Sequence, residues 1–268
     1  MSSPTAHIVL IHGLWLAPHS WRGWIDRYTA AGYTVHAPAW PGVSDVDEDL
    51  DHAKAPPGDI GIEAAADQFA TFVRGLPEPP ILIGHSMGGL ITQLLLDRGL
   101  GRAGIAIQPS KPRGVLRWPL SVMRSAWPVV HNPANARRAV PITERHFHYV
   151  FANTLSRRDS DAWHDKLAIP APGRPFFQIA MADMMPKDRA ATHIDFANAD
   201  RAPLLLVAGD RDNIMPESIV YENFARYRRS PARTGFKVFH RRPHLITVID
   251  GWEEVADYAL TWTARHTR

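Results

Sequence analysis

The sequence predicts an α/β protein built on a mostly parallel sheet that helices cover on both faces. Short, continuously apolar runs recur along the chain, and segments with helical periodicity stand between them. Continuous rather than alternating apolarity is typical of strands buried on both faces, and the alternation of strand and helix is typical of α/β folds. The chain has 268 residues, of which 45% are hydrophobic and 21% are charged, so it is long enough to bury a sizeable core.

Six apolar runs are predicted as strands. Gly, Pro or polar residues bound each run, and these residues favour turns. In chain order the expected strands are His7–Ile11, Tyr33–Ala37, Ile81–Gly84, Gly104–Ile107, Leu204–Ala208 and Phe236–Phe239.

Helices are predicted between and after these strands, where apolar residues recur with helical spacing. The expected helices are Ser20–Ala31, Ile62–Arg74, Met87–Arg98, Glu217–Arg229 and Trp252–Ala264. Gly32, Gly75 and Gly99 follow the first three, at the position where glycine commonly ends a helix. The last helix has a broad apolar face, so we expect it to pack back onto the sheet.

The alternation stops between Lys111 and about Arg201. This stretch is rich in Pro, Arg, His, Trp and Met and contains several helix-like patches. Because a structureless loop of this length is uncommon in a compact domain, we expect a helical insertion over the top of the sheet. The predicted core domain comprises residues 1–110 and 202–268, and the predicted helical cap, or lid, comprises residues 111–201.

Composition excludes several classes of function. The chain has no cysteine, which removes disulfide scaffolds, thiolate metal sites and cysteine nucleophiles. The net charge of +3 is modest and the arginines are scattered, so we expect no nucleic-acid partner. No apolar run approaches the roughly 20 residues of a membrane span, and Met1–Leu10 does not resemble a signal peptide. We expect a cytoplasmic protein; a homodimer is one alternative for its oligomeric state.

The most informative segment is the predicted strand that leads into Gly84-His85-Ser86-Met87-Gly88 and then into a helix. This arrangement matches a nucleophile elbow, G-x-S-x-G, in which a sharp turn exposes the serine in a strained conformation. Side chains at the two glycines would collide with the neighbouring strand and helix. The helix also directs its positive N-terminal end toward the serine. The motif therefore predicts Ser86 as a nucleophile.

A serine hydroxyl needs a base to accept its proton and an acid to orient that base. In this topology the acid and the histidine follow the serine in that order. Asp210 and Asp212 both follow the fifth predicted strand, and either can supply the acid. His240 ends the sixth strand, whereas His244 lies in the loop beyond it, where it can reach Ser86. His244 is the expected base.

These blocks, with His12-Gly13 after the first strand, resemble those of serine hydrolases of the α/β-hydrolase superfamily. The chain is most similar to the lidded esterase, lipase and cofactor-free haloperoxidase-like branch. The resemblance covers nearly the whole chain, and the blocks occur in the family's order. It implies an α/β-hydrolase fold and selects Asp212, four positions before Pro216, over Asp210. The chain departs from the family pattern at Pro243, the residue before the expected base, where these families often have glycine.

The resemblance also implies further site residues. The backbone N–H groups of Leu14 and Met87 are expected to form the oxyanion hole. The residues expected to support the site are His12, Gly13, Gly84, His85 and Gly88. The aromatic residues expected to line a substrate pocket are Trp15, Trp118, Trp127 and Phe147, while most other large apolar residues of the insertion are expected to form the cap's own core.

The activity implied is that of a serine hydrolase that cleaves carboxylic esters through an acyl-enzyme, with no cofactor or metal. The expected partner is a small to medium apolar ester. The same triad can also serve perhydrolysis, lactone opening, carbon–carbon bond hydrolysis or a lyase reaction, and a ligand receptor with little turnover is an alternative from another class. Ser86 argues against epoxide hydrolases and haloalkane dehalogenases, which resemble this chain but carry an aspartate at the elbow.

Three other motifs have simpler interpretations. Gly99–Gly104 matches a dinucleotide-binding pattern but follows a helix and precedes a strand, the reverse of what phosphate binding requires. His240 and His244 have the spacing of a helical zinc pair, but Pro243 stands between them. Asp45–Asp51 resembles a calcium loop but lacks the required Gly and Glu, so we expect a solvated acidic loop.

Overall fold

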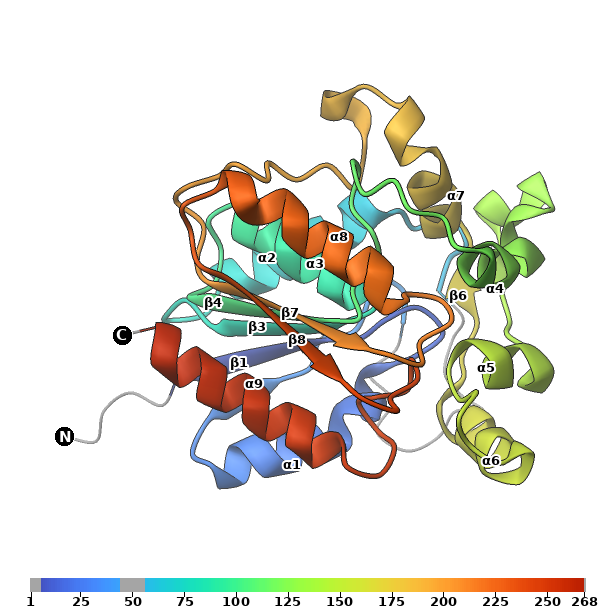
Figure 1. The fold of residues 1–268 in the computed structure, drawn as a ribbon, viewed down its shortest axis with the longest axis horizontal. Helices are drawn as coiled ribbons and strands as arrows, with labels where there is room; N and C mark the ends of the chain where they lie inside the picture. The colour runs from blue at the N-terminus through green and yellow to red at the C-terminus, as the bar shows by residue number, and fades with distance from the viewer. Residues whose placement is uncertain (1–5, 44–55, 268) are drawn as a thin grey trace.

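The structure, a computed structural model, describes residues 6–43 and 56–267. A six-stranded sheet lies at its centre, with strand order β2-β1-β3-β4-β7-β8 and parallel pairing between all neighbours (Figure 1). The strands are β1 (His7–Ile11), β2 (Thr34–His36), β3 (Ile81–His85), β4 (Ala103–Ile107), β7 (Leu204–Gly209) and β8 (Thr234–Phe239). The acidic stretch Asp45–Asp51 lies outside the described residues.

Helices cover both faces of the sheet. The helices α1 (Arg22–Ala30) and α9 (Trp252–His266) pack on the face that carries Ile83, Ile105 and Leu205. The opposite face, with Leu82, Ala106 and Leu206, is covered by α2 (Ile62–Arg74), α3 (Met87–Asp97) and α8 (Glu217–Arg226). Because both faces are buried, the central strands have no polar alternation. The predicted fold class is confirmed.

Element boundaries differ from the predictions at a few places. The predicted first helix is a 3₁₀ turn, Pro18–Trp21, followed by α1, and α8 also ends in a 3₁₀ turn, Tyr227–Arg229. Strand β8 begins earlier than predicted, at Thr234, and includes Gly235. A side chain at Gly235 would come within 2.8 Å of the indole nitrogen of Trp262. The packing of α9 against β8 therefore requires a glycine at position 235. A search for apolar runs does not extend the strand back to this glycine.

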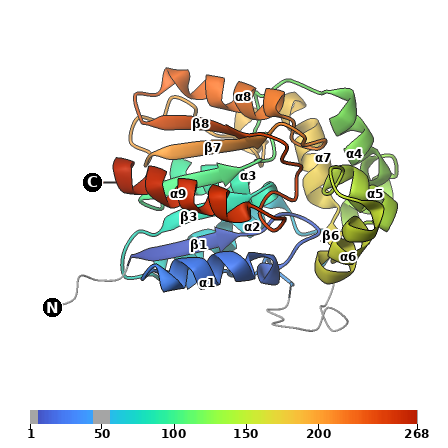
Figure 2. The same cartoon turned by 60° about the horizontal axis from the view of Figure 1, so that its bottom comes forward.

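The segment between β4 and β7 carries four further α-helices, which lie beyond the carboxyl ends of the strands (Figures 1 and 2). They are α4 (Leu120–Val130), α5 (Glu144–Val150), α6 (Arg157–Leu167) and α7 (Arg174–Met181). A short antiparallel pair, β5 (Ala139–Val140) and β6 (Ala171–Pro172), connects them. The loop after β1 holds this segment, since Trp15 donates to Val140 O and accepts from Ile169 N.

No helix within the described ranges is both long and apolar enough to cross a bilayer. The longest, α9, has 15 residues, fewer than the roughly 20 that a membrane-spanning helix needs.

Candidate active site

Ser86 is the single residue between β3 and α3, and its backbone is strained, with φ 56° and ψ −117°. A residue other than glycine in such a conformation costs about 1–3 kcal/mol, and such strain gathers at functional sites. Two neighbours hold the turn: Ser86 N donates to Ile107 O at 2.9 Å, and Ser86 O accepts from Ser110 N at 2.9 Å. The side chain is thereby fixed at the carboxyl edge of the sheet.

Three glycines allow the surrounding backbone to approach Ser86. A Cβ atom at Gly84 would overlap the carbonyl of Gly88, and one at Gly88 would overlap the carbonyl of Ile11. A Cβ at Gly13 would come within 2.8 Å of the Cβ of Ser86. The loop after β1, the end of β3 and the first turn of α3 therefore meet at a distance that only glycine permits.

His244 and Asp212 form a buried pair. His244 Nδ1 lies 2.6 Å from Asp212 Oδ2, and both side chains are fully shielded from solvent. The other carboxylate oxygen, Oδ1, accepts from the N–H groups of Ile214 and Met215, at 2.9 and 2.8 Å. Because a carboxylate only accepts, Nδ1 is the protonated nitrogen whenever the ring is neutral. Nε2 then carries the lone pair, and it has no hydrogen-bond partner in the described part of the chain.

The loop that carries His244 is held by its backbone from three sides. His85 Nε2 donates to His244 O at 2.8 Å, and Gln108 Nε2 donates to Pro243 O at 3.0 Å. Leu245 N donates to Phe151 O at 2.9 Å. Burial, followed by the nearby ring of His244, lowers the pKa of His85 well below its ordinary value, so His85 is a neutral anchor for this loop.

Ser86 and His244 line the same cavity, which has a volume of about 340 Å³. Leu14 and Met87 line it as well. Met87 is the first residue of α3, so its N–H has no acceptor within the helix. Apart from Ser86, His244 and a second serine, Ser110, the cavity is lined by apolar side chains. These are Leu14, Trp15, Met87, Trp118, Val122, Met123, Ala126, Trp127, Val130, Phe151, Phe176, Ile179, Ala180, Ile214 and Met215.

His12 supports the loop that carries Leu14. Its Nδ1–H donates to Gly13 O at 2.9 Å, and its Nε2 accepts from Trp40 N at 3.3 Å. Each ring nitrogen therefore has a fixed role, which suits only the neutral ring. Burial lowers the pKa of His12 from 6.5 to about 4, and the hydrogen bond to Gly13 partly offsets this effect.

Comparison with known families gives a match over most of the chain. Residues 8–258 match the alpha/beta hydrolase family. The chain belongs to this family. A search of curated proteins gave no match to the sequence of this α/β hydrolase.

Solved structures of similar fold cover nearly all of this α/β hydrolase. A monoacylglycerol lipase from Paleococcus ferrophilus has a TM-score of 0.68 at 22% identity, over 98% of this chain and 96% of that one. A thermophilic esterase from Thermogutta terrifontis has a TM-score of 0.68 at 18% identity, over 98% and 91%. A methylesterase from Arabidopsis has a TM-score of 0.64 at 16% identity, over 97% and 99%. At these identities the likeness shows a shared fold.

The structure of this α/β hydrolase brings together most of the residues singled out in the sequence. Trp15, Trp118 and Trp127 line the cavity. Phe147 does not line it, because the ring is fully buried behind Phe151, with 4.9 Å between ring centroids. In the sequence Phe147 and Phe151 are equivalent helix-spaced aromatics, and only packing decides which one reaches the cavity.

Sequence reasoning missed several lining residues. Ser110 lies just past the end of β4, at the sheet edge where parallel α/β proteins form their sites, so topology provides a signal for it. Val122, Ala126 and Val130 recur every four residues on α4, which is a helical face. Which face of α4 points to the cavity is set by tertiary packing.

The competing pair, Asp210 and His240, lies elsewhere. His240 is exposed, and its Nδ1 lies 3.1 Å from Asp210 Oδ2. Asp210 Oδ1 accepts from Arg241 N at 2.6 Å, and Arg241 has a positive φ of 60°. Asp210 thus stabilises the turn after β8, and neither residue lines the cavity. Because His240 and His244 have different partners, they do not converge on one metal ion.

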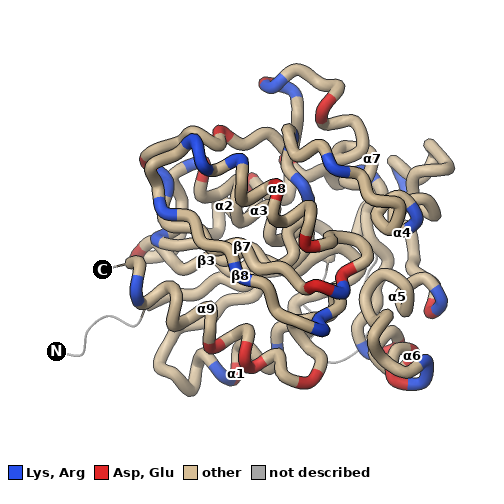
Figure 3. Tube along the Cα trace, viewed as in Figure 1, with Lys and Arg blue, Asp and Glu red and all other residues tan. Residues whose placement is uncertain are grey.

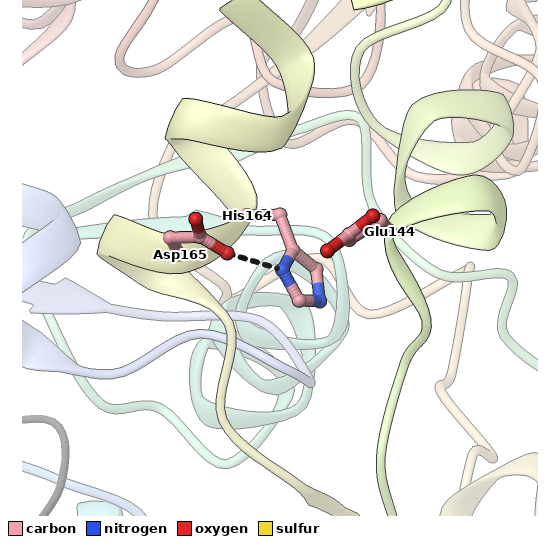
Figure 4. Close-up of side chains that lie close together, drawn as sticks. All are labelled: Glu144, His164 and Asp165. Carbon is pink, nitrogen blue, oxygen red and sulfur yellow. Dashed lines mark hydrogen bonds and ion pairs between the residues drawn. The ribbon is translucent and has the colours of Figure 1, made fainter. Parts of the chain in front are cut away.

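One group of potential metal ligands lies on α5 and α6 (Figure 4). Ligand atoms of Glu144, His164 and Asp165 lie within 4.8 Å of one another. Both carboxylates are exposed, and Arg157 Nη2 lies 3.7 Å from Glu144 Oε2, which supplies a positive charge there already. None of the three residues lines the cavity that contains Ser86, so we give them no part in the reaction.

Proposed function

We propose that this α/β hydrolase is a serine esterase that cleaves carboxylic esters through an acyl-enzyme. The observation that carries the proposal is the buried pair of His244 and Asp212, whose unpartnered Nε2 belongs to a histidine lining the same cavity as Ser86. The names of similar solved structures, which include a lipase, an esterase and a methylesterase, support the same chemistry.

In the first half of the proposed reaction, Ser86 Oγ attacks the ester carbonyl carbon while His244 Nε2 takes the hydroxyl proton. The carbonyl electron pair moves onto oxygen, and the N–H groups of Leu14 and Met87 stabilise this oxyanion. Asp212 stabilises the imidazolium. When the carbonyl re-forms, the carbon–oxygen bond to the alcohol breaks and the leaving oxygen takes the proton from Nε2.

In the second half, a water molecule attacks the acyl-enzyme and gives its proton to His244 Nε2. The second oxyanion collapses, the bond to Ser86 Oγ breaks, and Nε2 returns the proton to that oxygen. The products are a carboxylic acid and an alcohol, and the chain's own residues carry every proton transfer.

We further propose that residues 111–201 act as a cap over the core of residues 1–110 and 202–268, and that the substrate is a small to medium apolar ester. Both parts contribute cavity walls, since Leu14 and Ile214 come from the core and Val122 and Ile179 from the insertion. A cavity of about 340 Å³ is near the small end of the range for ligand pockets, about 300–1,000 Å³.

The test compares two serines of the same cavity on p-nitrophenyl esters of increasing chain length. Ser86→Ala should lower kcat/KM by about a thousandfold or more because the nucleophile is removed. Ser110→Ala is the matched control and should change it by less than about tenfold. Circular dichroism checks that both variants fold. Equal activity of wild type and Ser86→Ala would contradict the proposal.

A fluorophosphonate probe separates an esterase from a receptor with little turnover. Intact-protein mass spectrometry should show one adduct on wild type and on Ser110→Ala, and none on Ser86→Ala, because the probe reacts with an activated serine. Labelling without ester turnover would favour the receptor or one of the other triad reactions over the esterase.

A further inference from the structure

Exposed large apolar side chains concentrate on one part of the molecule. Within the described residues, all of them except Tyr221 belong to the insertion between β4 and β7. They are Leu116, Trp118, Leu120, Met123, Trp127, Met181, Met184 and Met185. Single exposed apolar residues need no explanation, but a group of this kind marks an interaction surface.

Helix α4 is apolar on two opposite sides. Val122 and Val129 are buried against the rest of the protein. Leu120, Met123 and Trp127 are 83%, 53% and 65% exposed, and their spacing of three and four residues places them on one outward face. The buried side accounts for the packing of α4, so the outward face has an apolar stripe that packing does not require.

The outward face is continuous with the cavity. Trp118, Met123 and Trp127 are exposed and also line the cavity that contains Ser86. The exposed stripe and the cavity wall therefore share Met123 and Trp127. An apolar molecule that leaves an apolar phase at this face meets apolar side chains along its path to the nucleophile.

The charges around this face are positive. Between Asp97 and Glu144 the sequence has no acidic residue, and the trace at α4 carries blue Lys and Arg positions without red ones (Figure 3). Arg117 and Arg124 flank the stripe; Arg117 is largely exposed, and Arg124 lies over the ring of Tyr149 at 4.3 Å. One carboxylate lies at the face. Glu222 accepts from the N–H groups of Leu116 and Arg117, at 3.1 and 3.0 Å, but its charge is compensated because it also pairs with Arg226 and lies 3.9 Å from Arg117 Nε.

The stretch around Met184 lies beside the segment that leads to Leu116 and α4, because Asp183 Oδ1 accepts from Gly114 N at 2.7 Å and Met185 O accepts from Arg113 Nε at 3.1 Å. Met184 is 73% exposed, and Lys187 and Arg189 follow it. Asp188, between them, is the one exposed carboxylate of this turn. Asp183 lies 3.2 Å from the buried Lys111, so its charge is compensated.

We propose that this docking face, defined by Leu116, Leu120, Met123, Trp127 and Met184, binds a lipid surface with anionic headgroups. Helices with an apolar face and flanking Lys or Arg bind in the interface of such surfaces. A second copy of this chain fits the face less well than a lipid surface does. In a twofold contact the positive regions of the two copies would face each other and repel. The proposal rests on the proposed function in one respect: the lipid surface is taken as the source of the apolar ester. Binding to the surface does not depend on ester hydrolysis.

The test measures vesicle binding by co-sedimentation with the Ser86→Ala protein, so that turnover plays no part. Vesicles of phosphatidylcholine alone are compared with vesicles that contain phosphatidylglycerol in equal amount. We expect stronger binding to the anionic vesicles, weakened by salt. Leu120→Gln and Met184→Gln should each lower the partition coefficient about fivefold. Tyr221→Gln, an exposed apolar residue outside the face, is the matched control and should bind as the parent does.

A second measurement keeps Ser86 and compares a soluble ester with the same acyl group presented in vesicles. Leu120 does not line the cavity, so Leu120→Gln should leave hydrolysis of soluble p-nitrophenyl acetate unchanged and slow hydrolysis of the vesicle-borne ester about fivefold. If no ester is hydrolysed, the proposed function fails, while the binding result still decides the docking face.

Three results would overturn the docking proposal. The first is equal binding of the parent, Leu120→Gln and Tyr221→Gln proteins to anionic vesicles, and the second is no binding by any of them. The third is a dimer in sedimentation velocity that Leu120→Gln converts to a monomer, without vesicle binding, which would make the face a contact between two copies.

Discussion

Asp210 and Asp212 follow the same strand, yet their surroundings give them different roles. Asp212 is buried and directs one oxygen to His244 and the other to two backbone N–H groups. Asp210 is only partly covered and holds a turn through His240 and Arg241. A difference of two positions in the chain therefore separates a carboxylate that pairs with a buried histidine from one that holds a turn.

Replacing these two carboxylates tests that distinction. Asp212→Asn should lower kcat about a thousandfold to ten-thousandfold, because the amide leaves His244 in the wrong tautomer. Asp210→Asn should leave kcat within about threefold and lower stability by about 1 kcal/mol through the lost turn contacts. Ester kinetics and urea unfolding of both variants provide the measurements, and similar kinetic losses in the two would refute the assignment.

His12 makes stability depend on pH. Its pKa falls from 6.5 to about 4 on folding, so the unfolded chain binds a proton that the folded protein does not bind between these values. The stability that depends on neutral His12 is complete above pH 6.5 and is lost as pH falls toward 4, by about 3 kcal/mol in total. Urea unfolding from pH 7 to pH 4 should show a shallower decline for His12→Gln than for wild type.

His131, whose ring is exposed, provides the control for that experiment. His131→Gln should show a decline parallel to that of wild type because its ring is not buried. A decline in His12→Gln as steep as in wild type would mean that other buried groups, such as His85, carry the pH dependence.

The sequence singled out candidate site residues where a motif and a chain order constrain them. Ser86 follows from the elbow, and His244 from its place beyond the last strand. Asp212 followed only from the family resemblance, because spacing alone leaves Asp210 open. Ser110 has no motif, and its place next to Ser86 depends on the pairing of β3 with β4.

Among the elements, β1, β3 and α3 meet at close backbone contacts. Gly88 lies in the first turn of α3, and its backbone contacts the carbonyl of Ile11 at the end of β1. This contact fixes the angle at which α3 leaves the sheet. The elbow is therefore a product of three elements rather than of one turn.

A methyl group at Gly88 should consequently disrupt the packing. Gly88→Ala should lower the free energy of unfolding by about 3 kcal/mol or more, since neither backbone can move without shifting a central strand. Gly75→Ala, at the end of α2 where φ is −77°, is the matched control and should change stability by less than about 1 kcal/mol. Urea denaturation of the purified proteins measures both, and equal stabilities would show that α3 shifts freely.

Element types were predictable because the core strands are apolar on both faces and glycines end three helices. The failures have local causes. Gly235 belongs to β8 because Trp262 packs against it, and an apolarity pattern cannot register that contact. Helix α4 has apolar residues on two sides, so periodicity alone cannot say which side faces the cavity and which faces outward.

Considered as a whole, the molecule places its cavity between the carboxyl edge of the sheet and the insertion. Long-range contacts such as that between Trp15 and Val140 set how the insertion sits, and no local pattern encodes them. The alternation of strands and helices was therefore predictable from sequence, whereas the cavity walls were not.

The volume of this cavity should limit chain length. Ala126 lines it and is half-buried, so Ala126→Phe should lower kcat/KM for long-chain p-nitrophenyl esters at least about tenfold while leaving the acetate within about threefold. Ala134→Phe, on an exposed turn away from the cavity, is the control. An unchanged chain-length profile in Ala126→Phe would mean that substrate occupies another region.

The pairing of β4 with β7 also orders events during synthesis. About 100 residues separate Ile107 from Leu204, and at about 5–20 residues per second the ribosome needs roughly 5–20 s to make them. During that interval Ser86 has already been synthesised, but the strands that precede Asp212 and His244 do not yet exist. The nascent chain therefore carries Ser86 before Asp212 and His244 exist, so the proposed reaction can begin only after the segment that contains them has emerged.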